Sequence, residues 1–217
     1  MENSRTLREE LLQGKYQELF QDIYQDRAGT EAQNSRYAQA IEKFEELFGE
    51  KQVEIYSAPG RSEVGGNHTD HQHGMVLATS INLDAIAVVS PGDSSVMQVV
   101  SEGYDMIEVD TKDLEAKYEE EGTTAALIRG VAASLAEKGY KVGGFQAYIT
   151  SDVLIGAGLS SSAAFEVLLG TILSGLYNDM KIDPVEIAKA GQFAENVYFG
   201  KPCGLMDQMA SSVGGLI

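Results

Sequence analysis

A glycine-rich stretch over residues 59–74 gathers side chains that could bind a polar ligand or a metal ion. Its polar members include the three histidines of the chain, an aspartate and an arginine: His68, His71, His73, Asp70 and Arg61. Imidazole nitrogens bind zinc, so one hypothesis is a metal site. Contiguous ligands on one loop rarely all point inward, and structural zinc usually takes further ligands from a second segment. The alternative is a loop for a small polyhydroxylated ligand, with Arg61 as a fixed positive charge for a phosphate or an anionic transition state.

A second glycine-rich stretch, Gly-Ala-Gly-Leu-Ser-Ser-Ser-Ala-Ala over residues 156–164, follows an expected strand and opens an apolar helix. Backbone amides and the positive end of a helix dipole converge at such a turn, and hydroxyls add donors or Mg²⁺ ligands, which suits a polyphosphate. The stretch lacks the Gly-Lys-Ser/Thr ending of a Walker loop, and Ser161 stands where a dinucleotide fingerprint has its third glycine. Both common nucleotide motifs are therefore excluded. A flexible Gly/Ser connection is the competing interpretation.

Two carboxylates, Glu195 and Asp207, flank a Gly- and Pro-containing turn over residues 200–204. Glu195 is late on an expected helix, so the two acids can converge from different elements, one on a metal ion and one on a substrate proton. Cys203 lies between them. A lone cysteine without a neighbouring histidine in the sequence is more often buried and inert than nucleophilic, so we expect no catalytic role for it.

Hydrophobic periodicity predicts the elements that position these residues. Helices are expected over 7–12, 19–24, 35–48, 124–138, 161–177 and 184–199. The first two are broken near Gly14 and again over 26–29, and the last has Asp183 as N-cap and Pro184 at its first position. Strands are expected over 53–57, 85–89, 96–100 and 145–150. Helices and strands interleave without strict alternation, so the expected fold class is α+β.

The composition excludes several classes of protein. The 217 residues carry 33 acidic and 16 basic side chains, for a net charge of −17, and one cysteine. This charge argues against nucleic acid and anionic membranes as partners, so any phosphate must be held by local geometry. No apolar window is long enough to span a bilayer, a single cysteine forms no internal disulfide, and the first residues are polar rather than a signal sequence. The expected compartment is the cytoplasm.

Taken in order, the three motifs resemble those of the galactokinases in the GHMP small-molecule kinase superfamily. The family's Gly-Arg, followed by Gly-Glu-His-Thr-Asp, is matched by residues 60–61 and 66–70. Its Gly-x-Gly-Leu-Ser-Ser-Ser-Ala is matched by residues 156–163, and its Cys-Gly-x-Met-Asp-Gln by residues 203–208. The resemblance runs from about residue 35 to the end and implies a known α+β fold. That fold is a GHMP kinase N-terminal domain, similar to domain 2 of ribosomal protein S5, over residues 35–217, preceded by an N-terminal helical extension over residues 1–34.

The resemblance also implies an ATP-dependent kinase that phosphorylates galactose at its anomeric hydroxyl, with Mg²⁺. Asp207 would be the catalytic aspartate, and Arg61 would lower its pKa and steady the transferring phosphoryl group. The implied sugar contacts are Asn67, His68, Asp70 and Gly204. The implied phosphate cradle is Gly156, Gly158, Ser160, Ser161 and Ser162, and the implied Mg²⁺ ligands are Ser162 and Glu195.

Two positions depart from the family's pattern. Its acidic sugar contact is Asn67 here, and the Tyr-Asn that follows its aspartate is His71-Gln72. An amide still accepts from a hydroxyl, but it also donates and carries no charge. The alternatives are therefore a kinase for a related sugar and a non-catalytic sugar and nucleotide sensor on the same scaffold. Asp207 and Arg61 favour the enzyme, because a sensor needs no proton-transfer chemistry.

The family's C-terminal domain has no counterpart in the chain, which ends on Leu216-Ile217 as if a strand were beginning. That domain is the expected intramolecular partner. Active sites of two-domain kinases lie in the cleft between the domains, so we expect the 217-residue chain alone to fold at least partly and to lack kinase activity.

Overall fold

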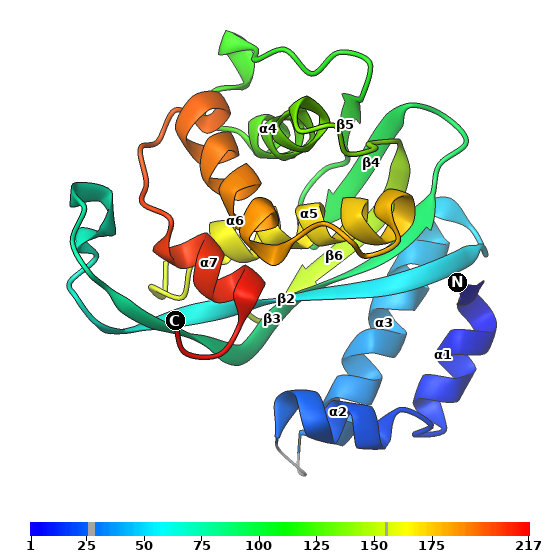
Figure 1. Cartoon of the computed structure of the whole chain (residues 1–217). Coiled ribbons are helices and arrows are strands. Elements are labelled where there is room, and N and C mark those ends of the chain that lie inside the picture. Colours follow the sequence, from blue (N-terminus) through cyan, green and yellow to red (C-terminus); the bar gives the residue numbers. More distant parts are fainter. Residues whose placement is uncertain (26–28, 155) are drawn as a thin grey trace.

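One mixed sheet with helices on both faces organises the computed structural model, which describes residues 1–25, 29–154 and 156–217 (Figure 1). The strands lie side by side in the order β1 (Glu2–Asn3), β2 (Gln52–Gly65), β3 (Leu77–Pro91), β6 (Phe145–Ser151), β4 (Val96–Ser101) and β5 (Ile107–Asp110). Neighbouring strands are antiparallel except β4 and β6, which are parallel. The parallel pair needs a crossover, and the segment that contains β5 and α4 (Thr124–Glu137) supplies it.

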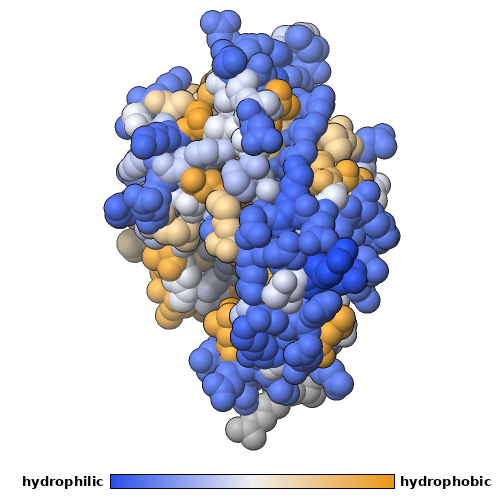
Figure 2. Space-filling view, turned by 90° about the vertical axis from the view of Figure 1, so that its right-hand side faces the viewer, coloured by the Kyte–Doolittle hydropathy of each residue, from blue (hydrophilic) through white to orange (hydrophobic). Residues whose placement is uncertain are grey.

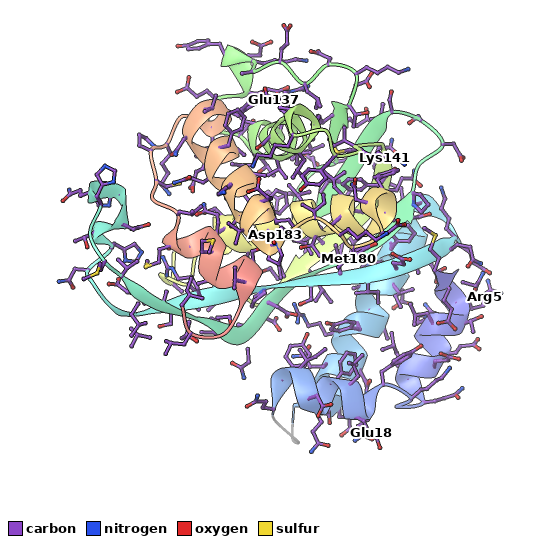
Figure 3. All side chains as sticks on the ribbon, viewed as in Figure 1. Arg5, Glu18, Glu137, Lys141, Met180 and Asp183 are labelled. Carbon is purple, nitrogen blue, oxygen red and sulfur yellow. The ribbon has the colours of Figure 1, made fainter. Side chains whose placement is uncertain are left out.

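Three N-terminal helices cover one face of the sheet: α1 (Ser4–Leu12), α2 (Gln17–Tyr24) and α3 (Thr30–Phe48). Buried Phe20, Tyr37 and Phe44 pack there with sheet residues such as Ile86 and Val88. Polar side chains of the same helices, Arg5 and Glu18 among them, lie on the outside (Figure 3). The apolar stripes of these helices thus bury one face of the sheet.

The N-terminal boundaries differ from the expected ones. α1 ends just before Gly14, as predicted, whereas the break predicted over residues 26–29 falls mostly outside the described residues. α3 begins at Thr30 rather than at Ser35, because the more polar residues 30–34 continue the helix and bury Thr30 and Asn34. A boundary between residues 34 and 35 therefore falls inside a helix.

Helices α4, α5 (Ser161–Asn178) and α6 (Pro184–Phe193) cover the other face. Their buried residues, such as Leu135, Leu168 and Ile172, pack against Val89 and Ala147 of the sheet. The predicted cap of α6 is confirmed, since the Asp183 carboxylate accepts from the Val185 N–H at 2.8 Å and Pro184 is the first helical residue. The single helix expected over 184–199 is wrong, because the chain changes to a wider π-helix, η3, at Ala194–Phe199.

The sequence patterns missed several short elements and the full length of two strands. β2 and β3 extend well beyond the expected runs, and their extended ends carry the histidine loop with its 3₁₀ turn η1 (Thr69–Gln72). β1, β5, the 3₁₀ turn η2 (Tyr118–Glu120) and helix α7 (Met206–Val213) were not expected. β1, β5 and η2 are too short for a hydrophobic period, whereas α7 carries one over its eight residues. Leu216 forms a bridge with Thr79 of β3, in agreement with the strand-like end expected there.

The surface is mostly polar on the side that Figure 2 shows, where apolar residues form small separate groups. This agrees with the excess of acidic residues in the sequence. Among the described residues, none of the helices combines the length and the apolar character needed to cross a bilayer.

Candidate active site

Arg61 owes its position to an irregularity in the pairing of β2 with β3. Pro59 pairs with Asp84 and Arg61 with Ser80, so Gly60 of β2 lies opposite a bulge of three unpaired residues, 81–83, in β3. A Cβ on Gly60 would lie 2.9 Å from the Leu159 carbonyl oxygen, and the Arg61 N–H donates to that same oxygen at 3.1 Å. The bulge therefore lets the glycine–serine loop dock on β2 and directs the Arg61 side chain beneath it.

Asp207 is brought to the same place by α7. This helix docks on the bulge through Ser211, whose hydroxyl donates to the Pro59 carbonyl at 2.7 Å. Arg61 then binds Asp207 in a bidentate pair, with Nε 2.7 Å from Oδ1 and Nη2 2.8 Å from Oδ2. Arg61 Nη1 donates to the Gly158 carbonyl at 2.6 Å. The planar guanidinium thus links the carboxylate to the predicted phosphate cradle.

The Arg61 pair controls the ionisation of Asp207. Burial alone would raise the pKa of this carboxyl, but hydrogen bonds from Arg61 and Ser160 and the charge of Arg61 outweigh that effect and hold the pKa below its usual value. Asp207 is therefore a carboxylate at neutral pH, ready to accept a hydrogen bond from a substrate hydroxyl.

His68 extends the network on the other side of Arg61. Arg61 Nη2 donates to His68 Nε2 at 2.8 Å, and Glu63 accepts from the His68 backbone N–H at 3.1 Å and binds its ring Nδ1. Arginine only donates, so Nε2 is the acceptor and the ring proton lies on Nδ1, facing Glu63. The hydrogen bond from His68 lowers the pKa of Glu63. Sequence reasoning missed Glu63, although an acid two residues after Arg61 was a visible signal.

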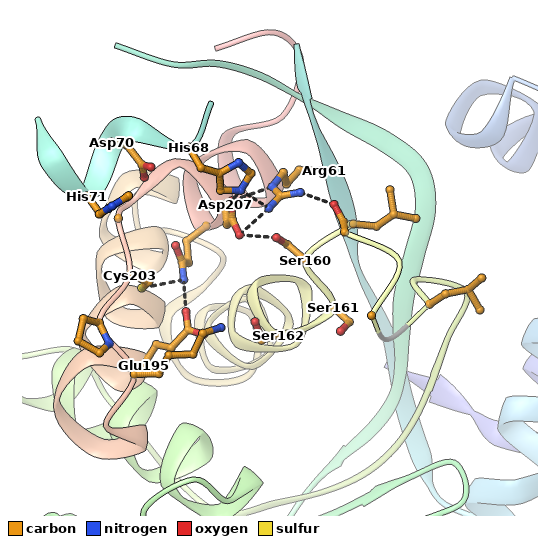
Figure 4. A pocket seen from close by; sticks show the side chains of 18 residues that line it. Arg61, His68, Asp70, His71, Ser160, Ser161, Ser162, Glu195, Cys203 and Asp207 are labelled. Atoms are coloured by element: carbon orange, nitrogen blue, oxygen red, sulfur yellow. Dashed lines mark hydrogen bonds and ion pairs between the residues drawn. The ribbon is translucent and has the colours of Figure 1, made fainter. Parts of the chain in front are cut away.

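Arg61, His68 and Asp207 line a pocket of about 490 Å³ together with the glycine–serine loop (Figure 4). All five residues of the predicted cradle line it: Gly156, Gly158, Ser160, Ser161 and Ser162. Gly156 and Gly158 have φ angles of 77° and 75°, in the left-handed region that favours glycine. The loop leads into α5, whose first-turn amides have no partners within the helix. The arrangement is suited to phosphate oxygens.

Glu195 and Ser162 also line the pocket, away from the Arg61 pair in Figure 4. Glu195 Oε1 lies 3.2 Å from Lys201 Nζ, and the negative charge of Glu195 raises the pKa of Lys201. A carboxylate and a hydroxyl are the hard oxygen donors that Mg²⁺ prefers, and the carboxylate already faces a cation in the pocket. These residues therefore fit a magnesium ion that is also bound by phosphate oxygens.

Asp70 and Gly204 meet across the pocket wall. The Asp70 carboxylate accepts from the Met206 N–H, at the start of α7, at 2.9 Å. A Cβ on Gly204 would lie 1.8 Å from Asp70 Oδ2, so only glycine allows this approach. The contact joins the histidine loop to the helix that carries Asp207.

We expect Gly204→Ala to displace Asp70 and lower kcat/KM by roughly 10²-fold, since a shift of about 1 Å in an active site costs that much. Steady-state kinetics with the substrate varied measure the loss. Gly65→Ala is the matched control, because a Cβ at Gly65 meets nothing within 4 Å. Equal kinetics for both variants would contradict a role for the Asp70–Gly204 contact.

The remaining candidate residues are Asn67, Cys203 and the three histidines, which the sequence suggested for sugar, nucleophile and metal roles. Asn67 is exposed, has a φ of 54° and is not among the residues that line the pocket, so its sugar contact remains a prediction. Cys203 lines the pocket, but burial raises its pKa, so the thiol stays protonated. Among the residues that the structure describes, no group of three or more His, Cys, Asp and Glu side chains is placed to hold a metal ion, His68, His71 and His73 included.

Comparison with known proteins agrees with the motifs. Residues 42–91 match the galactokinase galactose-binding signature, and residues 126–215 match the GHMP kinase N-terminal domain. The chain thus contains a match to the GHMP kinase N-terminal domain. It is 32% identical over 173 residues to a galactokinase of Clostridium tetani, a match that covers 79% of this chain and 44% of the relative.

Solved structures of GHMP kinases share the fold. The Lactococcus lactis galactokinase complexed with galactose superposes with a TM-score of 0.73 and 31% identity, over 81% of this chain and 46% of that chain. A Methanococcus jannaschii mevalonate kinase has a TM-score of 0.64 at 19% identity, over 76% and 52% of the two chains. The expected fold class, a GHMP kinase N-terminal domain with helices, is therefore confirmed. The chain spans less than half the length of these two galactokinases.

Proposed function

We propose that this protein transfers the γ-phosphoryl group of ATP to the anomeric hydroxyl of galactose. The observation that carries the proposal is the bidentate Arg61–Asp207 pair in one pocket with the glycine–serine loop and the histidine loop. The match to the galactose-binding signature over residues 42–91 supports galactose as the sugar. ATP is the second substrate, and its phosphates would lie on the cradle at the start of α5.

In the proposed reaction, the sugar lies against His68, Asp70 and Gly204 with its anomeric hydroxyl on Asp207. The hydroxyl oxygen forms a bond to the γ-phosphorus, the bond from that phosphorus to the bridging oxygen breaks, and ADP leaves. The hydroxyl proton goes to an oxygen of Asp207. Because Arg61 lowers the pKa of this carboxyl, Asp207 is a weak base that first orients the hydroxyl and takes the proton late, as suits a loose transition state.

The phosphate side of the site neutralises charge. Ser160, Ser161 and the α5 amides would bind phosphate oxygens, and Arg61 stands between the cradle and Asp207 to balance charge on the transferring group. Ser162 and Glu195 would hold Mg²⁺, which, when bound, neutralises triphosphate charge and helps to orient the γ-phosphoryl group.

A coupled ADP-release assay on the intact protein with Mg-ATP tests the proposal. The panel contains galactose and its C2, C4 and C6 analogues, and ³¹P NMR of the product identifies the phosphorylated position. We expect galactose to give the highest kcat/KM and a 1-phosphate product. A higher value for another sugar would assign a related kinase. Binding of sugar and nucleotide without turnover would assign a sensor. The cytoplasm, expected from the single cysteine, remains a prediction, as does the extent of an N-terminal extension.

A further inference from the structure

Glu166 is a buried acid for which the proposed transfer has no role. Its side chain is 0% exposed, and it lies one turn after Ser162 on α5, behind the residues that line the pocket. Removing a carboxyl from water is costly unless close partners compensate. A buried acid beside an active site therefore has to be explained by the contacts that it makes.

Gln208 connects Glu166 to the pocket. Its side-chain Nε2 donates to Glu166 Oε2 at 3.0 Å and to Glu195 Oε2 at 3.1 Å. Cys203 Sγ lies 3.8 Å from the same nitrogen, but a primary amide has only two N–H groups, and the two carboxyl oxygens are the closer acceptors. Gln208 and Glu195 are only 1% and 4% exposed. One buried amide therefore joins α5, the π-helical segment η3 and α7, next to Asp207.

The Gln208 amide turns its nitrogen toward both acids, where Oε2 of each accepts a hydrogen bond. Close packing confines the pair, because a Cβ on Gly191 of α6 would lie 2.9 Å from Glu166 Oε2 and 3.1 Å from Gln208 Cγ. Oε1 of Glu166 and Oε1 of Gln208 are buried without a hydrogen-bond partner in the described part of the chain. The polar contacts of the pair are thus concentrated in the Nε2 bridge.

The bridge decides which oxygen Glu195 offers to the pocket. Gln208 holds Oε2, which leaves Oε1 toward Lys201 at 3.2 Å. We propose that Glu166, acting through Gln208, positions the Glu195 carboxylate so that Oε1 faces the pocket as a magnesium ligand. This inference rests on the proposed function, in which Glu195 and Ser162 hold the ion. Glu166 is then a positioning residue, since it touches neither substrate nor ion.

Glu166→Met and Glu166→Gln separate this role from a purely structural one. Methionine fills a similar volume but accepts no hydrogen bond from the amide, whereas the carbonyl of glutamine still accepts one. The probe is Mn²⁺ in place of Mg²⁺, with its affinity for the ADP-saturated intact protein measured by electron paramagnetic resonance. Calorimetry with ADP in the presence of EDTA measures the metal-free nucleotide affinity.

We expect Glu166→Met to weaken Mn²⁺ binding by about tenfold or more, as is typical when a partner of a metal ligand is lost. Metal-free ADP affinity should stay at the wild-type level, and Glu166→Gln should retain most of the Mn²⁺ affinity. Ile187→Val is the control for packing. It removes the Cδ1 methyl group of a buried core residue on α6, so it should lower the Tm without changing Mn²⁺ binding.

Wild-type Mn²⁺ affinity in Glu166→Met would overturn the inference. Equal losses of Mn²⁺ affinity in Glu166→Met and Glu166→Gln would also overturn it, and so would a loss of metal-free ADP affinity that accompanies the loss of Mn²⁺ affinity. If Glu166→Met does not fold, Gln208→Met decides in the same assays. Failure of both to fold would assign the cluster to folding alone and also overturn the inference. Glu195→Gln distinguishes a failure of the proposed function from a failure of the role of Glu166. If it binds Mn²⁺ like wild type, the metal role in the proposed function fails, whereas a weakened Glu195→Gln beside an unaffected Glu166→Met refutes only the role of Glu166.

Discussion

Asp207→Asn is expected to abolish turnover, with a loss in kcat of at least ~10³-fold, while nucleotide binding is largely retained. Asparagine has nearly the same shape, but it keeps only one of the two oxygens that bind Arg61 and cannot take the proton from the sugar hydroxyl. The phosphate cradle lies on a separate segment, residues 156–162, and contacts Asp207 through Ser160, whose hydroxyl can still donate to the remaining amide oxygen. Coupled ADP release measures kcat, and calorimetry with ADP measures nucleotide affinity.

Asp179→Asn is the matched control for this variant. This variant removes the same charge from a side chain that is 84% exposed. The ion pair of Asp179 with Lys181 contributes little to stability at such an exposed position. We expect the control to retain wild-type kcat and stability. Near-normal turnover in Asp207→Asn would refute the assignment of Asp207, and a loss of ADP binding would show that the variant disturbs the cradle rather than proton transfer.

The convergence of the site could be predicted from the order of the motifs. Arg61, the cradle, Glu195 and Asp207 come from four separate segments, yet all line one pocket. The sequence places each motif at the end of a strand or at a turn, where the apolar pattern stops and polar side chains are free to face a ligand. Their roles in binding and catalysis stay predictions that the variants test.

The geometry that connects these residues could not be predicted, because it depends on contacts between distant segments. The irregular pairing at Gly60 occurs where the distant Leu159 approaches it, and the π-helix that carries Glu195 follows an uninterrupted helical pattern in the sequence. Helix α7 was missed although Met206, Met209, Ala210 and Val213 recur at three- and four-residue steps, because eight residues are few for assigning a helix from periodicity. Glu166 did leave a signal, a single charged residue inside the apolar run over 163–173, whose meaning appears only with Gln208 in place.

Arg61→Met is expected to lower kcat/KM by roughly 10³-fold and to move the acid limb of its pH profile to higher pH. Methionine is similar to the apolar stem of arginine but removes the charge and the bidentate hydrogen bonds to Asp207. Burial, which raises the pKa of Asp207, is then opposed by the hydrogen bond from Ser160 but no longer by the hydrogen bonds and charge of Arg61. The active form is the carboxylate, so a higher pKa means that activity is lost at a higher pH than in the wild type.

The same change reverses a contribution to stability. In the wild type, the pKa of Asp207 is below its ordinary value of 3.8, so the pair with Arg61 stabilises the fold at pH values above about 4 and loses that effect as the pH falls through the lowered pKa. In Arg61→Met, burial raises the pKa of Asp207, so this group makes the folded state less stable at neutral pH than at acid pH.

Arg61→Lys separates charge from geometry, because an ammonium restores the charge but not the planar fork. We expect its acid limb to stay near the wild-type position while kcat/KM stays low. An unchanged acid limb in Arg61→Met would show that Arg61 does not set the ionisation of Asp207.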